Sequence, residues 1–186
     1  MTNDLALYWL GAMLKGATAP PSGKWKTWVA LSDACRECKK RNGTIYAADK
    51  APEKDIPLHP HCRCRIVYLP AIRAGTATID GEQGADWYLL KTSKLPRNYL
   101  TTAQAFSLGW ERRKGNLDDV LPGVLIGGDV FWNVKGKLPS ASGRVWYEAD
   151  INYTGGYRGT DRILFCNDGL VFVTYDHYDT FFEIVK

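Results

Sequence analysis

Residues 143–174, with the sequence GRVWYEADINYTGGYRGTDRILFCNDGLVFVT, decide the fold of the C-terminal part of the chain. Three segments within this stretch, 145–151, 163–166 and 170–174, are rich in β-branched and aromatic residues, which favour strands. The last two flank an Asn-Asp-Gly turn at 167–169, a composition that predicts a β-hairpin. The sequence therefore predicts consecutive antiparallel strands here.

Helices are expected before these strands. The segment 84–92 is one candidate helix, Thr101 is placed to cap a second that stops at Gly109, and Asn116 is placed to cap a third, short one. Residues 181–185 predict a last strand. Helices followed by antiparallel strands indicate an α+β fold, with N-terminal helices packed on an antiparallel β-sheet.

The composition is that of an ordinary globular protein, and 186 residues suffice for one domain or two small ones. No apolar stretch is long enough to cross a membrane, and the first residues lack the basic start of a secretory signal. The net charge of +4 is uneven: residues 1–78 carry 12 Lys and Arg against 6 Asp and Glu, whereas residues 79–186 carry 12 against 14. The C-terminal part therefore needs a local basic pocket to hold a polyanion.

Four side chains with complementary chemistry lie in or near the strand-rich stretch: Glu148, Arg158, Arg162 and His177. A carboxylate base, an imidazole acid and two guanidinium groups are the parts that a metal-free enzyme needs to cleave RNA. Arginine suits phosphate because its planar donors match phosphate oxygens in pairs. The spacing does not exclude the alternative, a purely structural ion-pair cluster. Acidic and amide side chains at the strand ends, such as Asp150, are expected to close turns.

Eight strings in the second half of the chain carry a resemblance to known proteins: Lys94–Thr101, Leu108–Trp110, Lys114–Leu117, Ile126–Asp129, Gly136–Pro139, Glu148–Thr154, Asp161–Leu164 and Asp176–Tyr178. In these strings, and from about Asp80 to the C-terminus, the chain resembles the barnase-like family of small secreted, guanyl-preferring bacterial ribonucleases. The resemblance implies the fold of that family, helices on one side of a meandering sheet. It also implies transesterification of single-stranded RNA to a 2′,3′-cyclic phosphate, followed by hydrolysis to a 3′-phosphate, with no catalytic metal or cofactor.

Carried over position by position, the resemblance makes Glu148 the general base and His177 the general acid. Arg158 and Arg162 become the phosphate clamp, and Tyr178 becomes an aromatic residue that contacts the base or ribose.

The chain departs from the family at two places. Thr102 stands where the family has a phosphate-contacting lysine, and the base-reading loop has Trp132, Asn133, Val134 and Lys135 where the family has Ser-Asn-Arg-Glu. The lysine side chain donates hydrogen bonds but cannot accept them, so Lys135 cannot accept hydrogen bonds from the N–H groups at the edge of guanine. Backbone groups near Asn133 and stacking on Trp132 or Tyr178 remain as ways to hold a base, and Lys135 is a candidate replacement for the missing phosphate charge.

The N-terminal part contains a Cys35-x-x-Cys38 pair and, about twenty residues later, the string His59-Pro-His-Cys-Arg-Cys64. This spacing fits a structural zinc site with Cys35, Cys38, His59 and either Cys62 or Cys64 as ligands and His61 as a spare. Disulfides or a thiol-redox pair are the alternatives. A small module with few aliphatic residues needs such a cross-link for stability because it buries little apolar surface.

This segment also resembles the C-terminal end of phage minor head (head-morphogenesis) proteins, in its CxxC, the following Gly43 and the string at 59–64. The expected organisation is a Cys/His-rich head-protein-like module at 1–78, after a short helix near 3–15, and a ribonuclease domain at 79–186, with the boundary in the small residues 71–78. Together the two resemblances imply a phage- or mobile-element-borne effector, exported or virion-associated, that acts on RNA in a target-cell cytoplasm.

The expected partners are single-stranded RNA, a small acidic inhibitor resembling barstar, and a phage capsid or secretion component, but no membrane. A rival hypothesis is a virion structural or assembly protein whose nuclease-like domain only binds RNA or a partner. The substitutions at Thr102, Val134 and Lys135 favour this rival.

Overall fold

The computed structural model describes residues 23–50 and 57–186, and the expected helix near 3–15 lies outside these residues. The helices are α2 Arg36–Arg41, α3 Ala85–Thr92, α4 Thr102–Ser107, α5 Leu117–Val120 and the 3-10 helix η1 Gly81–Gln83. The strands are β1 Trp25–Val29, β2 Ile45–Ala47, β3 Arg65–Tyr68, β4 Ala71–Arg73, β5 Tyr99–Leu100, β6 Leu125–Phe131, β7 Trp146–Asp150, β8 Arg162–Cys166, β9 Val171–Thr174 and β10 Phe182–Val185.

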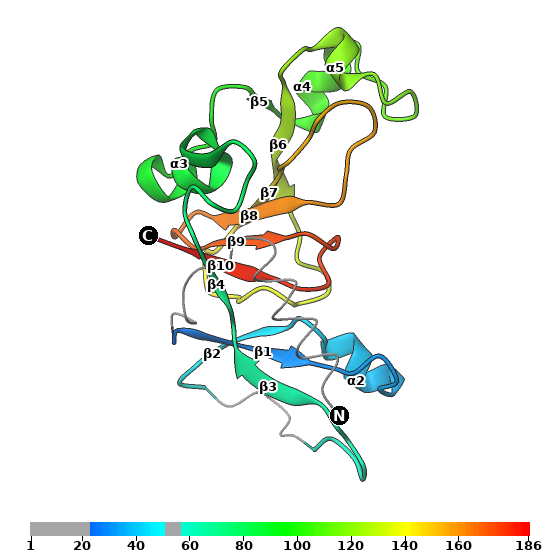
Figure 1. The fold of residues 1–186 in the computed structure, drawn as a ribbon, viewed down its shortest axis with the longest axis vertical. Coiled ribbons are helices and arrows are strands. Elements are labelled where there is room, and N and C mark those ends of the chain that lie inside the picture. Colours follow the sequence, from blue (N-terminus) through cyan, green and yellow to red (C-terminus); the bar gives the residue numbers. More distant parts are fainter. Residues whose placement is uncertain (1–22, 51–56) are drawn as a thin grey trace.

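A seven-stranded sheet in the order β4-β10-β9-β8-β7-β6-β5 forms the C-terminal part (Figure 1). Strands β6 to β10 form an antiparallel meander, as predicted, and the Asn-Asp-Gly turn closes the β8–β9 hairpin with Gly169 at φ 90°. The two edge strands β4 and β5 pair in parallel with their neighbours. The α+β prediction is confirmed, and the sheet is mixed at its edges.

The predicted helices also form. Thr101 caps α4 in a capping box: its hydroxyl accepts from the Gln104 backbone N–H, and the Gln104 side chain accepts from the Thr101 backbone N–H. Asn116 precedes α5, but its side chain accepts from the Glu111 backbone N–H and does not cap the helix. The helix prediction is thus confirmed, while the expected cap on α5 is wrong.

Two apolar layers cover the sheet. On one face, Ala85 and Leu89 of α3 pack with residues of the central strands, including Ile163 and Val173. A second cluster joins Trp146 and Phe172 of the sheet to residues of the N-terminal part. The helices α4 and α5 pack on β6 through a separate cluster around Trp110.

The first three residues of the expected domain boundary, Ala71–Arg73, belong to the sheet. Ala71 and Ile72 of β4 are fully buried, Ala74 N–H donates to the Val185 carbonyl, and Tyr175 donates to the Ala77 carbonyl. The physical reason is the pairing of β4 with β10, more than one hundred residues later in the chain. A run of small residues that looks like a linker is therefore an edge strand.

The N-terminal part forms a three-stranded antiparallel sheet, β2-β1-β3, with α2 beside it (Figure 1). This part packs against the larger sheet. Ile45 N–H donates to the Lys137 carbonyl at 2.8 Å, and the Trp25 ring meets the Phe172 ring edge to face at 6.1 Å. No helix among the described residues has the length and apolar character that a membrane span requires.

Candidate active site

One cavity of about 550 Å³ is lined by the four residues expected to carry catalysis, Glu148, Arg158, Arg162 and His177, and by Tyr178, which is expected to contact the substrate. Glu148 lies in the middle of β7 and Arg162 at the start of β8, while Arg158 lies in the loop between these strands. His177 and Tyr178 lie in the turn between β9 and β10. Three neighbouring segments of the sheet therefore bring together side chains that are up to about thirty residues apart in sequence.

A β-bulge shapes the strand next to Glu148. The register between β6 and β7 shifts between Gly127 and Asp129, and Gly128 has φ 92°. A Cβ on Gly127 would lie 2.4 Å from the Ala149 Cβ, so a larger residue does not fit there. Bulges are common beside active sites because they re-aim neighbouring side chains.

Asp150 links the two arginines. Its carboxylate accepts hydrogen bonds from Arg158 Nε at 2.5 Å and Nη2 at 2.7 Å, and Arg162 Nε lies 3.0 Å from Asp150 Oδ1 as an ion pair without hydrogen-bond alignment. Arg162 Nη1 also donates to the carbonyl oxygens of Gly159 and Asp161. Asp150 is 2% exposed, so its buried charge compensates two cations within one pocket.

The Arg158 guanidinium also lies 5.7 Å from the centroid of the Trp110 ring, at the distance of a cation–π contact. Burial by itself lowers the pKa of Arg158, but the hydrogen bonds to Asp150 and the negative charges of Asp150 and Glu148 together outweigh burial and raise it. Arg158 therefore stays charged and fixed in orientation, which is what a phosphate-binding group requires.

Tyr178 donates a hydrogen bond from its hydroxyl to Glu148 Oε2 at 2.6 Å. Burial, and next the hydrogen bond to Glu148, raise the pKa of Tyr178, so the phenol remains a donor at neutral pH. Phe131 stacks on the Tyr178 ring at 5.2 Å. The phenol thus orients the carboxylate.

A strained turn presents His177. His177 and Tyr178 have φ 56° and 71°, a left-handed conformation that costs free energy in residues other than glycine. The Asp176 carboxylate holds this turn by accepting from the Thr174 hydroxyl and from the backbone N–H groups of residues 179 and 180. His177 is exposed, and its imidazole has no hydrogen-bond partner among the described residues, which leaves both ring nitrogens available to a substrate.

The base-reading loop, residues 132–135, lies largely outside this pocket. Trp132 is 81% exposed and lines a separate cavity with Phe131, the residue that stacks on Tyr178. The Asn133 side chain is occupied inside the loop, because it donates to and accepts from the Leu138 backbone. Lys135 lines other cavities, beside the N-terminal part. The structure therefore does not bring the side chains of Asn133 and Lys135 to the catalytic pocket.

Thr102, at the position of the family's lysine, donates from its hydroxyl and its backbone N–H to Asp129 Oδ2 at 2.7 and 2.9 Å. At this position the chain therefore has no cation for the phosphate, and Thr102 instead holds the start of α4 against β6.

The expected metal ligands converge in the N-terminal part. His59 Nε2 lies 3.3 Å from Cys35 Sγ and 3.4 Å from Cys38 Sγ, and Cys38 Sγ lies 3.7 Å from Cys62 Sγ. The ligand atoms form two groups that share Cys38, one with Cys35 and His59 and one with Cys62 and Cys64. All these cysteines are free thiols, without disulfides. His61, the expected spare, belongs to neither group.

Sequence reasoning missed two supporting carboxylates. It assigned Asp150 to turn closure, whereas Asp150 is the counterion of both arginines. It assigned no role to Asp176, which builds the turn that carries His177. A signal existed for Asp176, an acidic residue directly before the histidine in a segment with strong turn character.

Comparisons with known proteins agree with this geometry. Residues 82–185 match the family model described as ribonuclease. Proteins named ribonuclease from Heyndrickxia coagulans, Bacillus intermedius and Bacillus pumilus are each 53% identical to this chain over 108 residues, 58% of its length. The match covers 99% of the Heyndrickxia coagulans protein and 67% of each of the other two.

Proposed function

The chain belongs to the ribonuclease family and is an RNA-cleaving enzyme, and on this premise we propose that it cleaves single-stranded RNA through the ribose 2′-hydroxyl, with Glu148 and His177 as base and acid. The observation that carries the proposal is the single cavity in which Glu148, His177, Arg158 and Arg162 meet. No other described cavity combines a carboxylate, an imidazole and two guanidinium groups.

In the first step, Glu148 accepts the proton of the 2′-hydroxyl, and the 2′-oxygen attacks the adjacent phosphorus. The bond from phosphorus to the 5′-oxygen breaks, and His177 donates a proton to that oxygen. The products are a 2′,3′-cyclic phosphate and a free 5′-hydroxyl. In the second step water attacks the cyclic phosphate, His177 accepts the water proton, and Glu148 protonates the departing 2′-oxygen.

Arg158 and Arg162 stabilise the negative charge that builds on the phosphate oxygens in each step. They suit this role because Asp150 fixes their orientation before substrate binds, so little reorganisation accompanies the reaction. The exposed position of His177 suits the role of a proton donor to a leaving group that departs into solvent.

The test is cleavage of the four NpA dinucleotides by the purified chain. We expect a cyclic-phosphate product that is lost, by on the order of a hundredfold or more, in Glu148→Ala and in His177→Ala. His61→Ala is the matched control, because it removes a histidine outside the pocket and should keep full activity. Equal activity in His61→Ala and His177→Ala would refute the assignment.

The same assay tests base preference. We propose a weaker guanine preference than in the family, because Lys135 replaces the acceptor of the base-reading loop and Val134 is 92% exposed in place of an arginine. A cleavage rate for GpA that exceeds the other three by more than about a thousandfold would contradict this proposal.

The Cys/His cluster is proposed to bind a structural zinc ion. Bond lengths of about 2.3 Å to sulfur and 2.1 Å to nitrogen in a tetrahedral site place two sulfurs about 3.8 Å apart and a sulfur and a nitrogen about 3.6 Å apart. The distances from His59 Nε2 to Cys35 Sγ and Cys38 Sγ are 3.3 and 3.4 Å, and Cys38 Sγ lies 3.7 Å from Cys62 Sγ. In addition, His59 Nδ1 lies 2.9 Å from the Pro60 carbonyl, and donation there would leave the Nε2 lone pair facing the sulfurs.

Metal analysis of the purified chain tests this second proposal. One zinc per chain, lost in Cys38→Ser but retained in Cys166→Ser, would support it, because Cys166 is a buried cysteine outside the cluster. A chain that holds no zinc when purified without chelator would refute it.

At the level of biology, we propose that residues 1–78, apart from the strand β4, which pairs in the larger sheet, act as a head-protein-like docking module, and that residues 79–186 are the ribonuclease domain of a phage- or mobile-element-borne effector. Such an effector would be exported or virion-associated, would meet RNA in the target-cell cytoplasm, and would be neutralised in the producing cell by a small acidic protein that resembles barstar. Support comes from the resemblance of residues 35–64 to head-protein tails. Growth arrest of bacteria that express the chain, absent with His177→Ala, is the expected result.

The alternative is a virion assembly protein whose nuclease-like domain only binds RNA, which Thr102 and Lys135 favour because both replace residues of the family's functional positions. RNA binding without any cyclic-phosphate product would establish it.

A further inference from the structure

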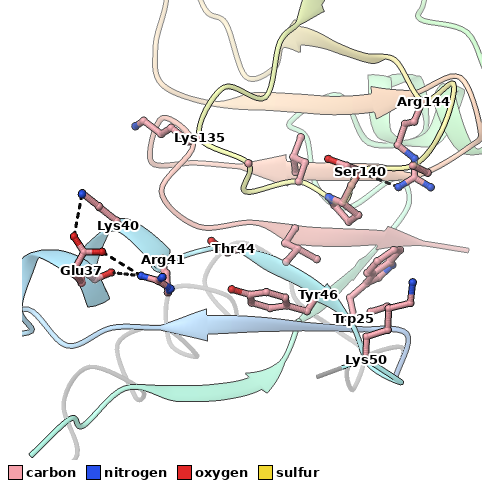
Figure 2. A pocket seen from close by; sticks show the side chains of 16 residues that line it. Trp25, Glu37, Lys40, Arg41, Thr44, Tyr46, Lys50, Lys135, Ser140 and Arg144 are labelled. Carbon is pink, nitrogen blue, oxygen red and sulfur yellow. Dashed lines mark hydrogen bonds and ion pairs between the residues drawn. The ribbon is translucent and has the colours of Figure 1, made fainter. Parts of the chain in front are cut away.

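Two adjoining cavities lie where the N-terminal part meets the ribonuclease domain, and together they are called the module cleft here. Their volumes are about 780 and 680 Å³, and they share Lys40 and Lys135 as lining residues. Figure 2 shows the larger cavity between β2, with α2 at one end, and the chain around Ser140. One wall of the module cleft therefore comes from the Cys/His-rich module and the other from the loop that follows β6.

Cations outnumber carboxylates around the module cleft. Arg36, Lys39, Lys40 and Arg41 come from α2, and Lys135 lies on the opposite wall (Figure 2). The single carboxylate of α2, Glu37, pairs with both Lys40 and Arg41.

Arg36, Lys39 and Lys135 are exposed and have no ionic partner among the described residues. Like charges that converge without counterions repel one another, so the module cleft is suited to a ligand with several negative charges.

The module cleft adjoins the turn between β9 and β10 that carries His177. Lys137, which lines the smaller cavity, donates from Nζ to the Tyr178 carbonyl at 2.9 Å and pairs with Asp179 at 3.2 Å. His177 is the residue before Tyr178. A polyanion in the module cleft would therefore lie close to the turn that carries His177.

Aromatic side chains lie beside the cations. Trp25 and Tyr46 both line the larger cavity and come from β1 and β2 (Figure 2). A cationic groove with aromatic side chains is the pattern by which proteins hold single-stranded nucleic acid, because cations track the phosphates and aromatic rings stack on bases. An acidic protein partner would pair with the cations, but it would not need the aromatic rings.

We propose that the module cleft is an accessory binding site for single-stranded RNA, through which the Cys/His-rich module holds the substrate strand beyond the scissile phosphate. The inference rests on the proposed ribonuclease function. The C-terminal domain has 12 cations against 14 acids, so its net charge does not attract RNA. The proposal assigns this attraction to the basic N-terminal part.

The test measures binding of a 12-nucleotide 2′-O-methyl RNA, which lacks the attacking hydroxyl and stays intact, as a function of KCl concentration. The triple variant Arg36→Gln, Lys39→Gln, Lys40→Gln removes three exposed cations of α2. The matched control Lys94→Gln, Arg97→Gln, Lys186→Gln removes the same charge from exposed positions that line neither cavity. Equal unfolding midpoints confirm that both variants fold.

If each of the three cations contacts a phosphate, the slope of log Kd against log KCl falls by about 2, at about 0.7 per contact. Extrapolated from 1 M salt, this corresponds to about a hundredfold weaker binding at 0.1 M KCl in the cleft variant, against less than about threefold in the control. Cleavage of a dinucleotide, which reaches only the catalytic pocket, should be equal in both variants.

Equal losses of RNA affinity in the two triple variants would overturn the proposal, and so would an unchanged salt slope in the cleft variant. Either result would indicate that the module cleft serves a partner other than RNA. Failure of dinucleotide cleavage in the unmodified chain would instead count against the ribonuclease function itself, because the binding assay needs no cleavage. The two failures are therefore distinguishable.

Discussion

Replacing Asp150 by asparagine should destabilise the chain more than any comparable substitution at the surface. Asp150 is 2% exposed and compensates both Arg158 and Arg162. Asparagine keeps the shape but removes the charge, so two guanidinium groups remain largely buried without a counterion. Breaking a buried ion pair from one side costs about 3–5 kcal/mol.

The matched control is Asp168→Asn, which makes the same substitution in a carboxylate that also binds one arginine through two nitrogens. The Asp168 carboxylate pairs with Arg144 at 2.6 Å, but its side chain is 45% exposed. A partly exposed pair contributes about 1 kcal/mol, because water reaches the Asp168 carboxylate and screens the charges, although the Arg144 side chain itself is 12% exposed. The two variants therefore separate the effect of burial from the effect of pairing.

The assay is urea unfolding followed by tryptophan fluorescence at pH 7. With a denaturant dependence of about 2 kcal/mol per molar urea, a loss of about 4 kcal/mol lowers the midpoint by about 2 M in Asp150→Asn, against about 0.5 M in Asp168→Asn. Midpoints that fall equally in the two variants would refute the claim that Asp150 is the buried counterion of the arginine pair.

Three further predictions concern the turn, the surface and the metal. Tyr178→Phe removes the hydrogen bond that orients the Glu148 carboxylate, so kcat for dinucleotide cleavage should fall by about tenfold, whereas an unchanged kcat would show that the bond does not position the base. Arg144 lowers the pKa of Asp168 to about 2, below its ordinary value of 3.8, so this carboxylate contributes stability above about pH 4 that is lost as the pH falls through 2. The difference in unfolding free energy between the unmodified chain and Asp168→Asn should therefore shrink between pH 6 and pH 2, and a constant difference would contradict the sign. If the proposed zinc ion is bound, its removal by a chelator should weaken binding of long RNA while cleavage of dinucleotides continues, because α2 carries the proposed ligand Cys38 as well as cleft cations. Equal loss of RNA binding and of dinucleotide cleavage would contradict the separate roles.

Local patterns in the sequence were sufficient for the central sheet. The Asn-Asp-Gly turn, the capping box at Thr101 and Gln104, and the order of helices before strands all act within a few residues, so they can be recognised without the fold. The segment at 71–73 could not be recognised in this way. It has too few residues for a period, and it becomes a strand only because β10 pairs with it.

The site was predictable where the resemblance supplied residue positions, and less so where function depends on three-dimensional contacts. The role of Asp150 depends on two arginines that approach from a loop and from the next strand, which spacing does not reveal. Lys135 looked like a replacement phosphate ligand because of its position in the loop, yet the loop turns it toward the module cleft. The module cleft could not be predicted from the sequence because it forms only when the N-terminal part packs onto the domain, through Trp25 and Ile45.

The central claim, cleavage through a ribose 2′-hydroxyl in this pocket, is tested most directly with a DNA oligonucleotide that carries a single ribonucleotide, in the presence of EDTA. The account predicts one cut, immediately 3′ to the ribonucleotide, with a cyclic-phosphate end, and no cut in the same oligonucleotide made entirely of deoxynucleotides. Cleavage of the all-DNA strand, or a ribonucleotide-dependent cut that persists in the double variant Glu148→Ala, His177→Ala, would contradict it.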